Sequence, residues 1–139
     1  MTLDGLLDFA QGRGIEIDDV PLRAITAASF PQGWVAFDSS KMETGAEEKT
    51  MLAHEVGHIA TGSFYNIHSP FDLRERSEHH ADKWAIKTLI PLDELRSCLR
   101  AGIDQRWEIA EYFGVTEELV GKALELYEDD LEAERRRCH

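Results

Sequence analysis

The sequence has few cysteines, an excess of acidic over basic residues, and no long hydrophobic run. Its two cysteines, Cys98 and Cys138, form neither a disulfide framework nor a C-x-x-C metal motif, so we expect two free thiols. Lys and Arg total 15 against 27 Asp and Glu, and the net charge of -12 disfavours nucleic acid as a partner. No uncharged stretch approaches the ~18 residues that span a bilayer, and the acidic N-terminus, with Asp4, is unlike a secretory signal. We therefore expect a cytoplasmic protein with no membrane contact.

The length and the patterning indicate one domain. A chain of 139 residues with 42% hydrophobic residues is long enough for one compact core, so we expect a single domain over residues 1–139. Its expected parts are an N-terminal helix and small sheet (1–45), the two helices of a candidate metal site (46–90), a C-terminal helical subregion (91–128) and a charged tail (129–139) that frays or stays solvated.

Local patterns predict the α+β class, with a small antiparallel sheet followed by a helical core and C-terminal helices. Three short runs rich in apolar and β-branched residues predict strands, and Pro31 and Gly33 predict a turn between the last two. These runs are IEIDDV, RAITAAS and GWVAFD. A helical period predicts helices over roughly 2–12, 46–61, 73–90, 92–100 and 104–128, the last broken at Gly114.

The stretch MLAHEVGHIATG carries two histidines one helical turn apart. Positions i and i+4 lie ~40° apart around a helix, so the rings of His54 and His58 can converge on one zinc ion. Glu55 stands beside them, where it can act as general base on a water activated by the metal. Gly57 costs up to ~1 kcal/mol relative to Ala inside a helix, so we expect another backbone to approach closely there. Two histidines at this spacing also occur on ordinary solvated helices, so a third ligand is needed to support a metal site.

The next predicted helix offers that ligand. On a helical wheel Glu78 lies at the centre of an apolar arc formed by Ala81, Ala85 and Leu89. A carboxylate there must be paired or bound to a metal, because an isolated buried charge is unfavourable. Asp82 shares this face and can orient a ligating histidine through its second ring nitrogen. His79, about 100° away, is the alternative third ligand.

The loop GSFYNIHSPFDL offers candidates for contact with a substrate. His68 is placed to line a cleft or to stabilise an oxyanion, although a lone loop histidine is more often simply exposed. Tyr65, with Phe64 and Phe71, is a candidate wall for an extended peptide or an oxyanion contact, although aromatic residues in loops also pack as satellite core.

The two motifs together resemble the ImmA/IrrE family of bacterial and phage zinc metallopeptidases, in which H-E-x-x-H is followed by E-x-x-A-D/N-x-F-A. Here the stretches AHEVGHIATG and SEHHADKWAIKTLIP carry the likeness, with Trp84 in place of the family's Phe, and the resemblance covers roughly residues 20–128. It implies that His54, His58 and Glu78 hold one Zn²⁺ and that Glu55 is the general base. It also implies a site-specific protease, often encoded by a mobile element, that cuts a partner repressor.

The resulting prediction is a zinc-dependent endopeptidase acting on a protein or peptide substrate. The rival prediction is a non-catalytic zinc-binding module that regulates or binds proteins, because it would show the same ligands. Two imidazoles and a carboxylate also accept other first-row divalent ions. The segment DQRWEIAEYFGVTEELVGKALELY resembles a helix-turn-helix, but its second helix is acidic or apolar apart from one Lys, which disfavours DNA reading.

Overall fold

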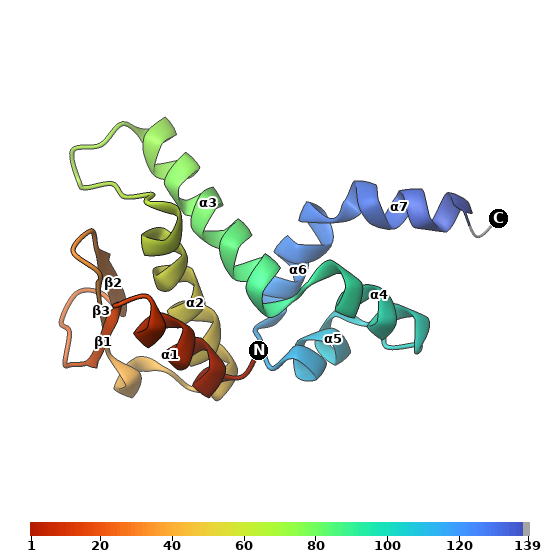
Figure 1. Ribbon diagram of the computed structural model, residues 1–139, viewed down its shortest axis with the longest axis horizontal. Helices are drawn as coiled ribbons and strands as arrows, with labels where there is room; N and C mark the ends of the chain where they lie inside the picture. Colours follow the sequence, from red (N-terminus) through yellow and green to blue (C-terminus); the bar gives the residue numbers. More distant parts are fainter. Residues whose placement is uncertain (138–139) are drawn as a thin grey trace.

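The computed structural model describes residues 1–137 and confirms the α+β class (Figure 1). A small sheet near the N-terminus is followed by most of the helices, and α2 and α3 lie side by side. In chain order the elements are α1 (Leu3–Gly12), β1 (Glu16–Asp19), β2 (Ala27–Phe30), β3 (Trp34–Phe37), the 3₁₀ turn η1 (Ser39–Lys41), α2 (Gly45–Thr61), α3 (Phe71–Leu89), α4 (Leu92–Arg100), α5 (Arg106–Phe113), α6 (Glu117–Leu126) and α7 (Glu128–Arg137).

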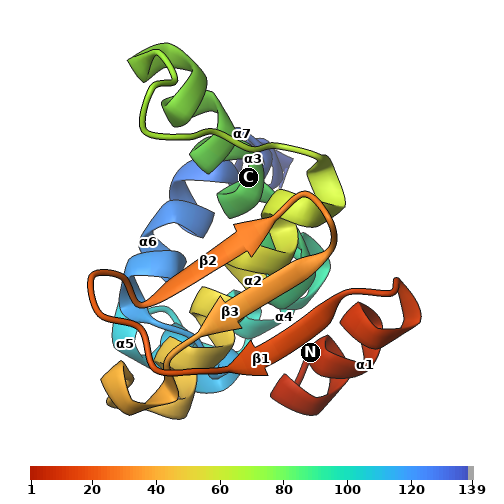
Figure 2. The same ribbon diagram turned by 90° about the vertical axis from the view of Figure 1, so that its left-hand side faces the viewer.

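The sheet is mixed, and the expectation of a purely antiparallel sheet was wrong for β1. The strand order is β1-β3-β2, with β1 parallel and β2 antiparallel to β3. The segment 20–26 carries the chain past the position of β3 to the far edge, and a tight turn with Gly33 at φ +95° then returns it between the other two strands. β3 is therefore central and β2 forms an edge. Figure 2 shows this sheet lying in front of α2.

Local signals fix where α2 begins and ends. The Thr44 hydroxyl accepts a hydrogen bond from the Glu47 amide at 3.1 Å, and the Glu47 carboxylate accepts one from the Glu43 amide at 3.0 Å. This reciprocal arrangement satisfies backbone donors at the helix start. Gly62 ends the helix in the left-handed conformation with φ +66°, which glycine adopts without strain. The histidines of α2 are thus held on a helix whose two ends are both specified by sequence.

α2 and α3 pack unusually closely at Gly57. A Cβ atom added at Gly57 would lie 2.8 Å from the carbonyl oxygen of Ala81 on α3. The expected close approach of another backbone is thereby confirmed. Next to this contact the two helices bury apolar side chains, including Leu52, Val56, Ala85 and Leu89.

As far as Arg137, the tail is helical rather than frayed. α7 has an acidic first turn and ends on three arginines, an arrangement that complements the helix dipole at both ends. It buries no residue, in line with the expected solvated segment, and Glu134 binds Arg96 and Arg100 of α4.

Cys98 is a buried free thiol, as expected, while Cys138 lies outside the described residues. Within residues 1–137 no helix has the length and apolar character needed to cross a membrane.

Candidate metal centre

Two imidazoles from α2 face each other across one helical turn. The Nε2 atoms of His54 and His58 are 3.2 Å apart, and the two rings are nearly perpendicular. His58 is buried, with 5% of its surface exposed, whereas the side chain of His54 is 20% exposed. His58 therefore lies deeper in the protein than His54.

The Glu78 carboxylate from α3 completes the group. Its Oε2 is 2.7 Å from Nε2 of His54, and its Oε1 is 3.1 Å from Nε2 of His58. One ligand atom from each of the three residues lies within 4.8 Å of the others. The alternative ligand His79 is exposed and is not part of this group. The structure thus brings together the three residues that the two motifs single out.

The second ring nitrogens determine the chemistry of the centre. Nδ1 of His54 donates to Oδ1 of Asp82 at 2.8 Å, and Nδ1 of His58 donates to the Ser63 carbonyl oxygen at 2.7 Å. A carboxylate and a carbonyl only accept hydrogen bonds, so both protons of the neutral rings lie on Nδ1. Both Nε2 atoms then present lone pairs toward each other and toward Glu78. Such a cluster of acceptors fits a bound cation, and the fixed outer hydrogen bonds are typical of metal-ligating histidines.

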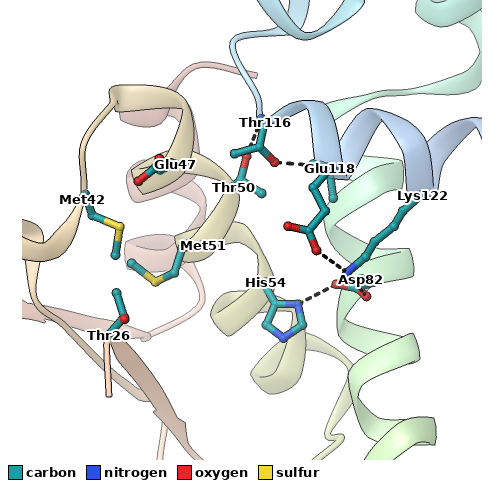
Figure 3. A pocket seen from close by; sticks show the side chains of 11 residues that line it. Thr26, Met42, Glu47, Thr50, Met51, His54, Asp82, Thr116, Glu118 and Lys122 are labelled. Carbon is teal, nitrogen blue, oxygen red and sulfur yellow. Dashed lines mark hydrogen bonds and ion pairs between the residues drawn. The ribbon is translucent and has the colours of Figure 1, made fainter. Parts of the chain in front are cut away.

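Asp82 links the centre to the C-terminal helices, as Figure 3 shows. Its Oδ2 accepts a hydrogen bond from Nζ of Lys122 on α6 at 3.0 Å. Burial disfavours the charged carboxylate, but the hydrogen bonds from His54 and Lys122 hold the pKa of Asp82 below its ordinary value. Burial also opposes the charged form of His54, yet the hydrogen bond to Asp82 and the charge of Glu78 raise the pKa of His54. Sequence reasoning predicted the contact with Asp82 and missed Lys122.

Of the loop residues, the structure places Tyr65 at the centre and His68 away from it. The Tyr65 hydroxyl donates to Oε1 of Glu78 at 2.8 Å, which raises the pKa of Tyr65 to about 12. His68 is exposed, its backbone amide donates to the Asn66 side chain, and it does not line the cleft at the centre. Ser63 was also missed, because it contributes a backbone carbonyl; the only signal is the helix-ending Gly62 just before it.

The centre opens into a cleft of about 200 Å³ between α2 and the edge strand β2. Glu55 lines this cleft together with His58 and Glu78, and Phe64 and Tyr65 close one side. The strand side is formed by three consecutive small residues, Ala27, Ala28 and Ser29. The Glu55 carboxylate, which is not one of the three candidate ligands, therefore faces the same cleft as His58 and Glu78.

Comparison with known proteins agrees with this geometry. A family model described as the IrrE N-terminal-like domain, a peptidase family, matches residues 39–125. The match includes both metal-site helices and extends to α6, and it covers more than half of the chain. Neither the curated proteins nor the solved structures gave a match to the chain.

Proposed function

The chain belongs to the IrrE N-terminal-like domain family and is a metallopeptidase, and from this premise we propose that it is a zinc-dependent endopeptidase that hydrolyses a peptide bond in a protein partner. A transcriptional repressor is the partner that the family resemblance suggests. The observation that carries the proposal is the meeting of two imidazoles and the Glu78 carboxylate beside a cleft that Glu55 lines.

His54, His58 and Glu78 are the residues that would hold the ion. Bound there, zinc would supply Lewis-acid polarisation of the scissile carbonyl and would lower the pKa of a water molecule toward ~7. The Asp82 carboxylate and the Ser63 carbonyl accept the Nδ1 protons of the two histidines, and they orient both rings with Nε2 toward the ion site. The protein thus supplies ligands whose direction is set before a substrate arrives.

Glu55 would move the protons of the reaction. Its carboxylate takes a proton from the attacking water and delivers it to the leaving amine, so the nitrogen departs as a neutral group. Tyr65 is placed to assist, because its hydroxyl already donates within the cleft and a tyrosine hydroxyl is protonated at neutral pH. In this proposal the hydroxyl turns from Glu78 toward the carbonyl oxygen of the substrate.

The edge strand β2 would hold the substrate. An extended peptide can add to an open sheet edge through main-chain hydrogen bonds, and the small side chains of Ala27, Ala28 and Ser29 let a backbone approach. This strand lies along the same cleft as Glu55 and His58. The substrate is therefore expected to be an extended segment of a polypeptide.

The test is the substitution Glu55→Gln, with Glu48→Gln as the matched control on the same helix outside the cleft. Each protein would be loaded with zinc, its metal content measured by mass spectrometry, and its activity assayed on a mixture of peptides from a digested proteome. We expect Glu55→Gln to keep the metal and to lose cleavage by at least about 10²-fold, while the control behaves as the wild type.

Two results would contradict the proposal. Full cleavage by the Glu55→Gln protein would remove Glu55 from the mechanism. A zinc-loaded wild-type protein that cuts no peptide or unfolded protein would favour the non-catalytic zinc-binding module instead.

A further inference from the structure

A second cavity of about 330 Å³ adjoins the metal centre on the side of α6 (Figure 3). It lies between α2, the start of α6 and Thr26, the residue that precedes β2. Its volume is at the lower end of the ~300–1,000 Å³ typical of ligand sites, which suits one or two side chains rather than a folded partner.

This cavity neighbours the cleft that contains Glu55. On the side of β2, Ala27 lines the cleft and the preceding residue, Thr26, lines the cavity. On the helix side, His58 lines the cleft and His54, one turn earlier, lines the cavity. The two spaces therefore neighbour each other at the start of β2, and candidate metal ligands line both of them. A peptide lying along β2 with its cut bond at the centre would place a neighbouring side chain in the cavity.

The walls of the cavity are mainly apolar. Met42, after η1, and Met51 of α2 present their thioethers on one side of the cavity. Leu119 of α6 also lines it. Methionine side chains are flexible and polarisable, so they adapt to apolar groups of different shape. The cavity therefore suits apolar side chains of medium to large size.

The charged residues that line the cavity disfavour an acidic side chain. Three acids, Glu47, Glu118 and Asp82, face a single lysine, Lys122, so an acidic side chain would meet an excess of negative charge. Asp82 and Glu118 both already pair with Lys122, at 3.0 Å and 3.8 Å, so a basic side chain would have to compete with Lys122 for them. The charges therefore exclude acidic side chains, and the apolar walls favour apolar side chains over basic ones.

We infer that this cavity is the specificity pocket of the peptidase and receives an apolar side chain such as Leu, Met or Phe next to the cleaved bond. The inference rests on the proposed function, because it concerns the substrate of the same centre. Met42 is the residue best placed to tune the pocket, because it lies outside α2 and contributes no ligand.

The experiment begins with cleavage of proteome-derived peptides by the zinc-loaded protein, with the cut sites read by mass spectrometry. One position flanking the cut should show Leu, Met or Phe and exclude Asp and Glu. Two synthetic peptides that differ only in Leu or Ala at that position should then differ in kcat/KM by about 10- to 100-fold, the effect of burying one such side chain.

Variants of the pocket link this preference to the cavity. Met42→Trp fills it and should lower the Leu/Ala ratio of kcat/KM about tenfold, whereas Met42→Ala enlarges it and should shift the preference toward Phe and Trp. Leu73→Trp adds the same side chain at an exposed position of α3 outside both spaces, and it should leave the ratio unchanged.

The outcomes separate the two proposals. Cleavage with no apolar preference, or with a preference that neither Met42 variant changes, overturns the pocket and leaves the peptidase standing. If the wild type cuts nothing, no cut site defines these peptides. Binding to the Glu55→Gln protein is then measured by fluorescence anisotropy with an extended peptide that carries one central Leu and with its Ala counterpart. A preference for the Leu peptide that Met42→Trp abolishes then supports the pocket without the peptidase, and equal binding of the two peptides overturns both.

Discussion

Replacing Gly57 by Ala should damage the metal centre without touching any ligand. The new Cβ would lie 2.8 Å from the carbonyl oxygen of Ala81, about 0.6 Å short of the 3.4 Å at which ordinary contact begins. The obstacle is backbone, so it cannot turn aside, and α2 and α3 must move apart. His54 and His58 lie on one of these helices and Glu78 on the other, so the separation acts directly on the distance between the ligands.

The expected magnitudes follow from this displacement. Ligand distances in metal sites are held within about 0.2 Å, so a shift of several tenths of an ångström should weaken zinc binding at least about tenfold. The cost of overpacking, about 1–3 kcal/mol, is partly offset by the gain of up to ~1 kcal/mol from the better helix former. We therefore expect the free energy of unfolding of the metal-free protein to fall by about 0–2 kcal/mol. Competition with a chromogenic chelator measures the first effect and urea unfolding the second.

Gly45→Ala is the matched control. Gly45 begins the same helix, and a Cβ there meets nothing within 4 Å. This variant should bind zinc as tightly as the wild type. If Gly57→Ala also kept wild-type affinity, the close approach of the two helices would not be what sets the ligand geometry, and the reasoning would fail.

Three further predictions concern the surroundings of the centre and the fold. Asp82→Ala should lower zinc affinity about 10- to 100-fold, because His54 loses the acceptor that orients it, and unchanged affinity in a chelator competition would contradict this. Zinc affinity should fall as the pH drops from about 8 to about 6, because protons compete with zinc for the imidazoles. Burial lowers the pKa of His54, but the hydrogen bond to Asp82 outweighs burial and raises it, so the loss of zinc should begin above the ordinary pKa of 6.5. A pH titration at fixed zinc concentration tests this direction. Tyr127→Phe should cost about 1–2 kcal/mol of unfolding free energy with no change in zinc affinity, because its hydroxyl donates to the buried Ile90 carbonyl at 2.9 Å, and equal urea midpoints would refute it.

The parts of the centre that depend on spacing along a helix could be predicted from the sequence. The separation of His54 and His58 fixes their relative direction once the segment is helical, and the helical wheel placed Glu78 and Asp82 on one face of the next helix. Gly57 could be interpreted because a glycine lowers the stability of a helix. Its presence inside α2 therefore suggested that another backbone leaves no room for a side chain there.

Other parts of the centre and of the fold could not be predicted, because no residue pattern marks them. The partner of His58 is the backbone carbonyl of Ser63, which any residue type would supply. Lys122 reaches Asp82 across 40 residues of sequence, and the register of α6 on α3 that allows it is set by packing. The parallel pairing of β1 with β3 depends on the path of the segment 20–26, for which strand patterns carry no direction. The predicted features follow from residue types and their spacing along a helix, whereas the missed ones leave no such pattern in the sequence.

The shortness of the sheet edge at β2 has a consequence for what such a protease leaves behind. The four residues of β2, Ala27–Phe30, can pair with only a short segment of a substrate. That segment must already be extended and must not be paired with other parts of the substrate. Helices and internal strands of a native target do not meet this condition, while linkers between its modules do. A partner cut at this edge would therefore be divided into a few intact, folded pieces instead of being degraded, and its activity would end because modules that worked together had been disconnected.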